Sequence, residues 1–159
     1  MTMDASEPGG TEEGLVKLTF PLDPQEWHGS ATETLWAEPL AAGEYRLRNT
    51  PFYAHGISAE DVVFAREEDG RLWFAGVARH GGRSTYRLIP SAGVAPAHLG
   101  EHWDPLQRLG CSYEEGPGRL LAVDVPPEAD IQAVYELLEL GEQEQLWEFE
   151  EGHCGHPLP

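Results

Sequence analysis

The sequence predicts an α+β protein, with a small β-barrel lobe over residues 15–82 and a lobe of mixed strands and helices over residues 83–151. The first half of the chain holds five short strand-like runs at roughly ten-residue spacing, without a helical pattern between them. From residue 84 onward, strand-like runs alternate with helical ones. The chain has 159 residues, 40% of them hydrophobic, which is enough to bury an ordinary core.

The first lobe begins with residues 15–20, in which apolar and polar residues alternate as in a half-buried strand. Further strands are expected over residues 32–39, 44–49, 61–67 and 71–79. Asp69 and Gly70 stand between the last two runs and predict a hairpin there. Ser58 is expected to cap a helical turn before the fourth strand. This succession of short strands predicts an SH3-like barrel.

The second lobe is expected to have strands over residues 84–90, 111–115, 119–125 and 146–151, with helices over residues 96–109 and 127–141. Gly100 and Pro105 predict a break in the first helix. Pro127 and Gly141 predict the start and the end of the second helix, which carries one apolar stripe. The resulting β-α-β-β-α-β order is the ferredoxin-like one, in which two helices cover one face of a four-stranded antiparallel sheet.

The two ends of the chain are polar. Residues 1–14 predict a disordered acidic N-terminus, and residues 152–159 a C-terminal tail. Cys111 and Cys154 would lie at opposite edges of a ferredoxin-like sheet, so we expect two free thiols. Few cysteines, no signal peptide and no long apolar run predict a cytoplasmic protein.

Charge is the strongest feature of the composition: 28 acidic residues against 10 basic ones, a formal net charge of -18. This balance argues against nucleic acids and anionic membranes as partners, since both require basic residues. Because half of the acidic residues follow residue 100, the leading hypothesis is a module that binds a basic protein, such as an inhibitor or a toxin-neutralising, immunity-like protein. The candidate contact residues are Glu136, Glu139, Glu142, Glu144, Glu148, Glu150 and Glu151.

An alternative hypothesis is a small-molecule sensor or enzyme with a pocket between the two lobes. Its candidate ligand-binding residues are Trp36, Asn49, Phe52, Tyr53 and Arg87. The same aromatic side chains would also suit core packing, so the sequence leaves both interpretations open.

Metal binding is left open at two places. His98 and His102 belong to an H-x-x-E-H pattern that binds zinc when it lies on a continuous helix. The second place combines His153, Cys154 and His156, which are possible ligands in the tail. We assign no metal, cofactor or catalytic residue, and we expect a binding protein rather than an enzyme because the chain lacks nucleophile and phosphate-binding motifs.

Several separated stretches of the chain resemble one family: residues 16–21, 35–40, 45–52 with Asn49-Thr50-Pro51, 56–63, Ser84-Thr85-Tyr86-Arg87 and 121–126. They occur in the order found in the bacterial domain-of-unknown-function family numbered 4265, and the resemblance covers about residues 15–156. It implies a bacterial protein and no particular activity.

Overall fold

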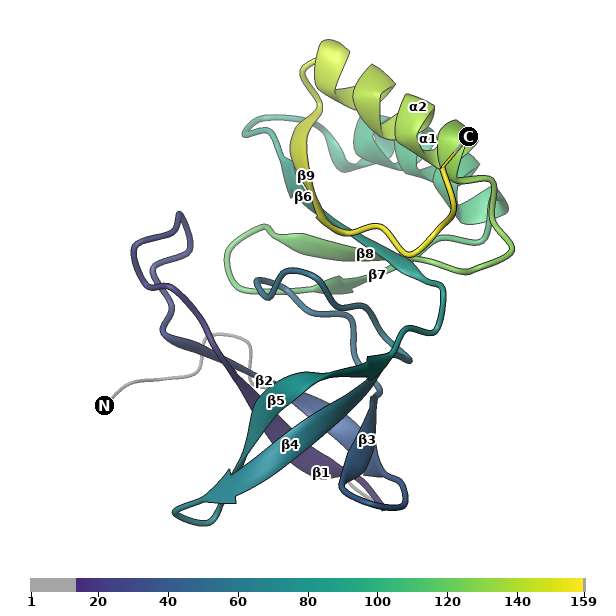
Figure 1. The fold of residues 1–159 in the computed structure, drawn as a ribbon. Helices are drawn as coiled ribbons and strands as arrows, with labels where there is room; N and C mark the ends of the chain where they lie inside the picture. The colour runs from purple at the N-terminus through teal and green to yellow at the C-terminus, as the bar shows by residue number, and fades with distance from the viewer. Residues whose placement is uncertain (1–13, 159) are drawn as a thin grey trace.

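The computed structural model describes residues 14–158, so the expected disordered N-terminus lies outside the described residues except for Gly14. The strands are β1 (Val16–Pro21), β2 (Thr32–Pro39), β3 (Glu44–Leu47), β4 (Val62–Glu68), β5 (Arg71–Arg79), β6 (Ser84–Pro90), β7 (Ser112–Glu115), β8 (Leu121–Val125) and β9 (Trp147–His153). The helices are α1 (Pro96–Arg108) and α2 (Ile131–Gln143). Together they form an α+β fold in which a barrel and a helix-covered sheet lie one above the other (Figure 1).

Strands β1 to β5 close into a barrel, which confirms the five predicted strands. Sequential neighbours are antiparallel, and a short parallel pairing of β1 with β5 closes the ring. Leu18, Leu35 and Leu47 are buried inside it. β3 ends earlier than predicted because Asn49 leaves the ladder and its side-chain oxygen accepts the Trp36 backbone N–H at 2.8 Å.

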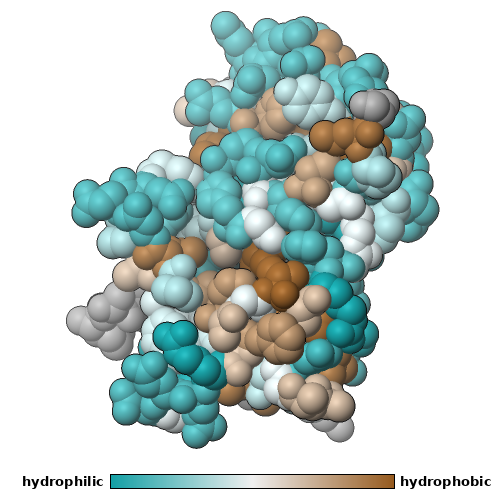
Figure 2. Space-filling view, in the orientation of Figure 1, coloured by the Kyte–Doolittle hydropathy of each residue, from teal (hydrophilic) through white to brown (hydrophobic). Residues whose placement is uncertain are grey.

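The second half of the chain follows the predicted β-α-β-β-α-β order. Its four strands form an antiparallel sheet in the order β7-β8-β6-β9, and α1 and α2 cover one face of it (Figure 1). Tyr86, Leu138 and Trp147 belong to the core between sheet and helices. On the visible side of the molecule, hydrophilic residues dominate the helical half, whereas the barrel has a brown apolar area (Figure 2).

Both helices differ from the prediction. α1 continues through Gly100 and Pro105. Proline has no N–H to donate to the Glu101 carbonyl oxygen, but Glu101 is exposed, so water can hydrogen-bond to that oxygen. α2 begins at Ile131, not at Pro127, since the Asp130 carboxylate caps it by accepting the Ala133 N–H. The predicted C-terminal stop of α2, Gly141, lies inside the helix.

Neither the turn before β4 nor the C-terminal end follows the prediction. Residues 58–60 form a tight turn with Glu60 at φ 69°, closed by the Asp61 carboxylate, and no helical turn. β9 extends to His153, into the segment predicted as a tail. Beyond it His156 is buried, with its two ring nitrogens 2.6 Å from Ser84 Oγ and 2.8 Å from the Pro126 carbonyl oxygen.

Cys111 and Cys154 are both free, next to strands at opposite edges of the sheet. Cys111 is buried, and burial raises the pKa of its thiol to about 12. We therefore expect Ellman's reagent to react with one thiol per native chain, that of Cys154, because only the thiolate is nucleophilic. Both thiols should react in denaturant. Equal reaction rates in the native protein, or no reaction after unfolding, would contradict this.

The long connection between β3 and β4, residues 48–61, lies between barrel and sheet and joins them (Figure 1). The Thr50 N–H donates to the Glu114 carboxylate of β7 at 2.8 Å.

Among the described residues, no helix is long and apolar enough to cross a membrane.

Candidate functional site

The face of the sheet that points away from the helices carries charged residues. Tyr86 and Leu88 of β6 point into the helix-side core, so the intervening Arg87 points to the opposite face. In the register of β6 with β9, Arg87 lies opposite Glu150, and Ile89 opposite Glu148. These two pairs form the floor of the candidate site.

Arg87 and Glu33 hold one segment of the connection between β3 and β4 from two sides. The fully buried Glu33 carboxylate of β2 accepts the backbone N–H groups of Phe52, Tyr53 and Ala54, the last two at 3.0 and 2.9 Å. The Arg87 guanidinium, 1% exposed, donates to the carbonyl oxygens of Phe52 and Ala54. We refer to this arrangement of Glu33, Arg87 and residues 52–54 as the Glu33–Arg87 clamp.

Burial dominates the electrostatics of the clamp. It raises the pKa of the Glu33 carboxyl, although the three N–H donors and Arg87 oppose that rise. It also lowers the pKa of Arg87, against the effect of Glu33 and Glu150. A Cβ atom on Gly152 would lie 1.4 Å from Arg87 Nη1, so glycine is required there for the guanidinium to fit.

A surface groove of about 310 Å³ opens above this floor. We refer to it as the β6–β9 groove; its lining residues are Trp27, Arg87, Ile89, Glu148, Phe149 and Glu150. The Trp27 side chain, from the β1–β2 connection, is 52% exposed, and its indole N–H donates to Glu150 Oε1 at 3.2 Å. Its ring contacts the Tyr53 ring edge to face, with centroids 5.7 Å apart. The groove therefore has an aromatic wall that the fold holds in place.

Two carboxylates of the groove form no close ion pair in the described part of the chain, although the Arg87 charge acts on Glu150 at longer range. Within residues 14–158, no Lys, Arg or His forms an ion pair with Glu148 or Glu150. Beside them stand the Trp27 ring and Ile89, which is 37% exposed. Such a surface fits a cation that has an apolar stem.

The other predicted partner-binding residues do not share one face with Glu148 and Glu150. Glu136 and Glu139 line a separate groove between α1 and α2. Glu142 accepts the Phe149 N–H, and Glu144 lies 2.6 Å from His102 Nε2. Glu151 interacts with Tyr86, on the helix side of the sheet. Only the pair Glu148 and Glu150 thus joins a groove with an aromatic wall.

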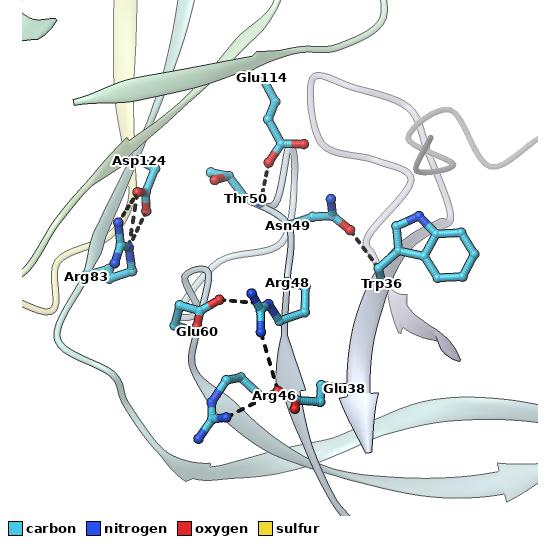
Figure 3. A network of polar contacts seen from close by, with 10 residues as sticks. All are labelled: Trp36, Glu38, Arg46, Arg48, Asn49, Thr50, Glu60, Arg83, Glu114 and Asp124. Atoms are coloured by element: carbon cyan, nitrogen blue, oxygen red, sulfur yellow. Dashed lines mark hydrogen bonds and ion pairs between the residues drawn. The ribbon is translucent and has the colours of Figure 1, made fainter. Parts of the chain in front are cut away.

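The predicted ligand-binding residues do not enclose a cavity. Asn49 binds the Trp36 backbone at the start of the connection (Figure 3). Phe52 and Tyr53 are buried in a small cluster with Leu120 and Ala122. Trp36 lines a different groove, on the barrel, which Arg87 does not line. Of these residues, Arg87 alone reaches the β6–β9 groove.

Ion pairs within each half of the molecule lie outside the groove (Figure 3). Arg83, just before β6, forms a two-pronged pair with Asp124 of β8, at 2.7 to 3.1 Å. The pKa of Arg83 is raised because its guanidinium donates to that carboxylate. On the barrel, Arg48 pairs with Glu38 and Glu60.

The histidine motif on α1 does not bring three ligands together. The centroids of the His98 and His102 rings are 5.1 Å apart, and the acidic group that contacts His98 is that of the exposed Glu101, at 3.6 Å. In the C-terminal segment, His156 is fully engaged in the hydrogen bonds described above, and the Cys154 thiol donates to its carbonyl oxygen at 3.6 Å. His153 stacks on His80, and among the described residues it forms no cluster of three ligands with Cys154 and His156.

Sequence reasoning missed Trp27, Ile89 and Glu33. Trp27 lies in a connection without periodicity, and an exposed tryptophan there was the only available signal. Glu33 occupies a polar-looking position of a predicted strand, where nothing in the pattern indicates burial. Its role depends on residues 52–54, which are distant in sequence.

The model of a protein family described as a domain of unknown function, DUF4265, matches residues 33–149. A crystal structure of a hypothetical protein from Neisseria gonorrhoeae is similar, with a TM-score of 0.75 and 18% identity over 89% of this chain and 96% of that one. At this identity the similarity shows a shared fold alone. No curated protein matches the sequence.

Proposed function

We propose that this chain, which belongs to the DUF4265 family, is a non-catalytic module that binds a basic protein through an Arg or Lys side chain in the β6–β9 groove. The observation that carries the proposal is the pair Glu148 and Glu150, which form no ion pair with any residue of the described range 14–158, beside the half-exposed ring of Trp27. The family assignment itself supplies no activity.

The groove offers three contacts to such a side chain. Carboxylates form charge-assisted hydrogen bonds with a guanidinium or an ammonium group. An indole face attracts the same cation with about 0.5–1 kcal/mol at an exposed site. The methylene stem can pack on Ile89, which is exposed enough to be covered. No single contact is strong, so affinity would come from their combination and from the rest of the partner surface.

The net charge of -18 supports the same kind of partner. Long-range attraction accelerates the association of oppositely charged proteins and weakens with salt, over a Debye length of about 8 Å at physiological ionic strength. An inhibitor or toxin-neutralising role is the form of this function that we favour. We place it in the cytoplasm, where two free thiols are stable.

For the fold, we infer an SH3-like barrel and a ferredoxin-like second half. Support comes from the closed ring of five short strands. The element order β-α-β-β-α-β with strand order β7-β8-β6-β9 supports the second assignment.

The proposal predicts that a short peptide with one arginine among alanines shifts the indole N–H signal of Trp27 in a two-dimensional NMR titration. The Trp27→Phe variant assigns that signal. Changing both Glu148 and Glu150 to glutamine should weaken binding about tenfold or more, because both carboxylates and their hydrogen bonds to the cation are affected. Added salt should weaken the binding as well.

The double variant Glu136→Gln and Glu139→Gln is the matched control, since it removes the same charge from the groove between α1 and α2. Its affinity should stay close to that of the unchanged protein. If both double variants weaken peptide binding equally, the effect comes from net charge alone. The proposal that the β6–β9 groove binds the peptide would then be wrong.

A further inference from the structure

We propose that Asp61, His80 and His153 bind a divalent transition-metal ion such as Zn²⁺, at the junction of the barrel and the sheet. One ligand atom from each of the three residues lies within 4.8 Å of those of the other two. Two imidazoles and one carboxylate form a donor set that suits Zn²⁺ and related ions. Within residues 14–158, no other group of His, Cys, Asp and Glu meets this criterion.

The fold brings the three residues together from distant parts of the chain. Asp61 directly precedes β4 and His80 directly follows β5, and the pairing of Val62 with Arg79 places them side by side. His153 ends β9. Its ring stacks on that of His80, with centroids 4.5 Å apart and an angle of 24° between the planes.

The buried Asp61 carboxylate is oriented by the backbone. Oδ1 accepts the Gly81 N–H at 2.8 Å, and Oδ2 accepts the Ser58 N–H at 2.9 Å. In the described part of the chain, His80 is the only side chain that forms an ion pair with this carboxylate, at 2.8 Å. A buried carboxylate requires compensation of its charge, and a metal ion would provide it.

His153 is held by a hydrogen bond typical of the residues around a metal ligand. Its Nδ1 lies 2.9 Å from Ser58 Oγ, which also contacts the Thr85 hydroxyl at 2.6 Å. A fixed partner on one ring nitrogen orients the ring and leaves the other nitrogen available to a metal. Ser58 thus contributes to two of the three ligands, through its hydroxyl to His153 and through its N–H to Asp61.

The site is open to solvent on one side. The His80 side chain is 44% exposed, whereas that of Asp61 is fully buried. An ion can therefore enter next to His80. Three protein ligands leave the fourth position of a tetrahedral Zn²⁺ ion to water or to a ligand from outside.

The test uses the full chain, purified without a histidine tag and treated with a chelator. Equilibrium dialysis against Zn²⁺, followed by elemental analysis, should show one ion per chain, and Co²⁺ should give the visible bands of tetrahedral coordination. His80→Gln should lower the Zn²⁺ affinity about tenfold or more. Because the His80 side chain is 44% exposed, this variant should fold, which its melting curve checks.

The matched control is His98→Gln, which removes an exposed histidine of α1 and should leave the affinity unchanged. The proposal is overturned if the chain binds no Zn²⁺, or if His80→Gln binds it as tightly as the unchanged protein. It is also overturned if Cys154→Ser abolishes binding and His80→Gln does not, because the ion would then lie in the C-terminal segment. The peptide titration is run with chelator present, so its outcome is independent of this one.

Discussion

Replacing Arg87 with methionine is expected to lower the free energy of unfolding by about 3–5 kcal/mol, because it removes two buried hydrogen bonds and the positive charge that acts on the buried Glu33 carboxyl. Glu33 would keep its buried charge without a cationic neighbour. The carbonyl oxygens of Phe52 and Ala54 would each lose a donor. Methionine fills a similar volume, so the loss reflects charge and hydrogen bonding more than a cavity.

Urea unfolding followed by circular dichroism measures this difference. The control is Arg66→Met on β4, where the side chain is 63% exposed and forms an ion pair with the exposed Glu68 at 3.5 Å. That change should stay within about 0.5 kcal/mol. If both variants unfold at the same urea concentration, Arg87 does not hold the two halves together.

A double-mutant cycle separates the clamp from its members. With Glu33→Gln added to Arg87→Met, no unpaired buried charge remains, so the combined loss should be smaller than the sum of the single losses. The expected coupling is about 1–3 kcal/mol. Additive losses would mean that Glu33 and Arg87 act independently on residues 52–54.

Sequence patterns predicted the number, type and order of the strands and helices well, because each depends on local alternation or helical periodicity. They placed the ends of the helices less well. The start of α2 was assigned to Pro127, whereas the capping side chain of Asp130 determines it. The break expected in α1 at Pro105 is absent, and the carbonyl that proline leaves without a helical donor belongs to the exposed Glu101, where water can reach it.

The candidate site was only partly predictable. The number of acidic residues indicated the C-terminal region as the binding surface. The pairing register of β9 with β6 was needed to distinguish Glu148 and Glu150, which line the groove, from the acidic residues of α2. Arg87 was predicted to line a ligand pocket, and its Nε and Nη2 instead donate to backbone carbonyl oxygens inside the molecule. Such contacts join residues far apart in sequence, so no local pattern could reveal them.

The second large effect on stability is expected from replacing Gly141 with alanine. Here the gain in helix propensity must be compared with the cost of steric overlap. Alanine is favoured over glycine inside a helix by about 1 kcal/mol. At this position, however, a Cβ atom would lie 2.1 Å from Cζ2 of Trp147. The indole is 1% exposed and is held by a 2.9 Å hydrogen bond from its N–H to the Leu138 carbonyl oxygen, so it cannot easily move aside.

Overpacking of a well-filled core costs about 1–3 kcal/mol and occasionally more, and the overlap here is severe. We therefore expect Gly141→Ala to destabilise the protein by about 2 kcal/mol or more, despite the gain in helix propensity. Gly100→Ala isolates that gain, because the same change in α1 meets no atom within 4 Å and should stabilise by up to about 1 kcal/mol. Opposite shifts of the two melting temperatures would support the argument, and a stabilised Gly141→Ala protein would show that Trp147 can repack.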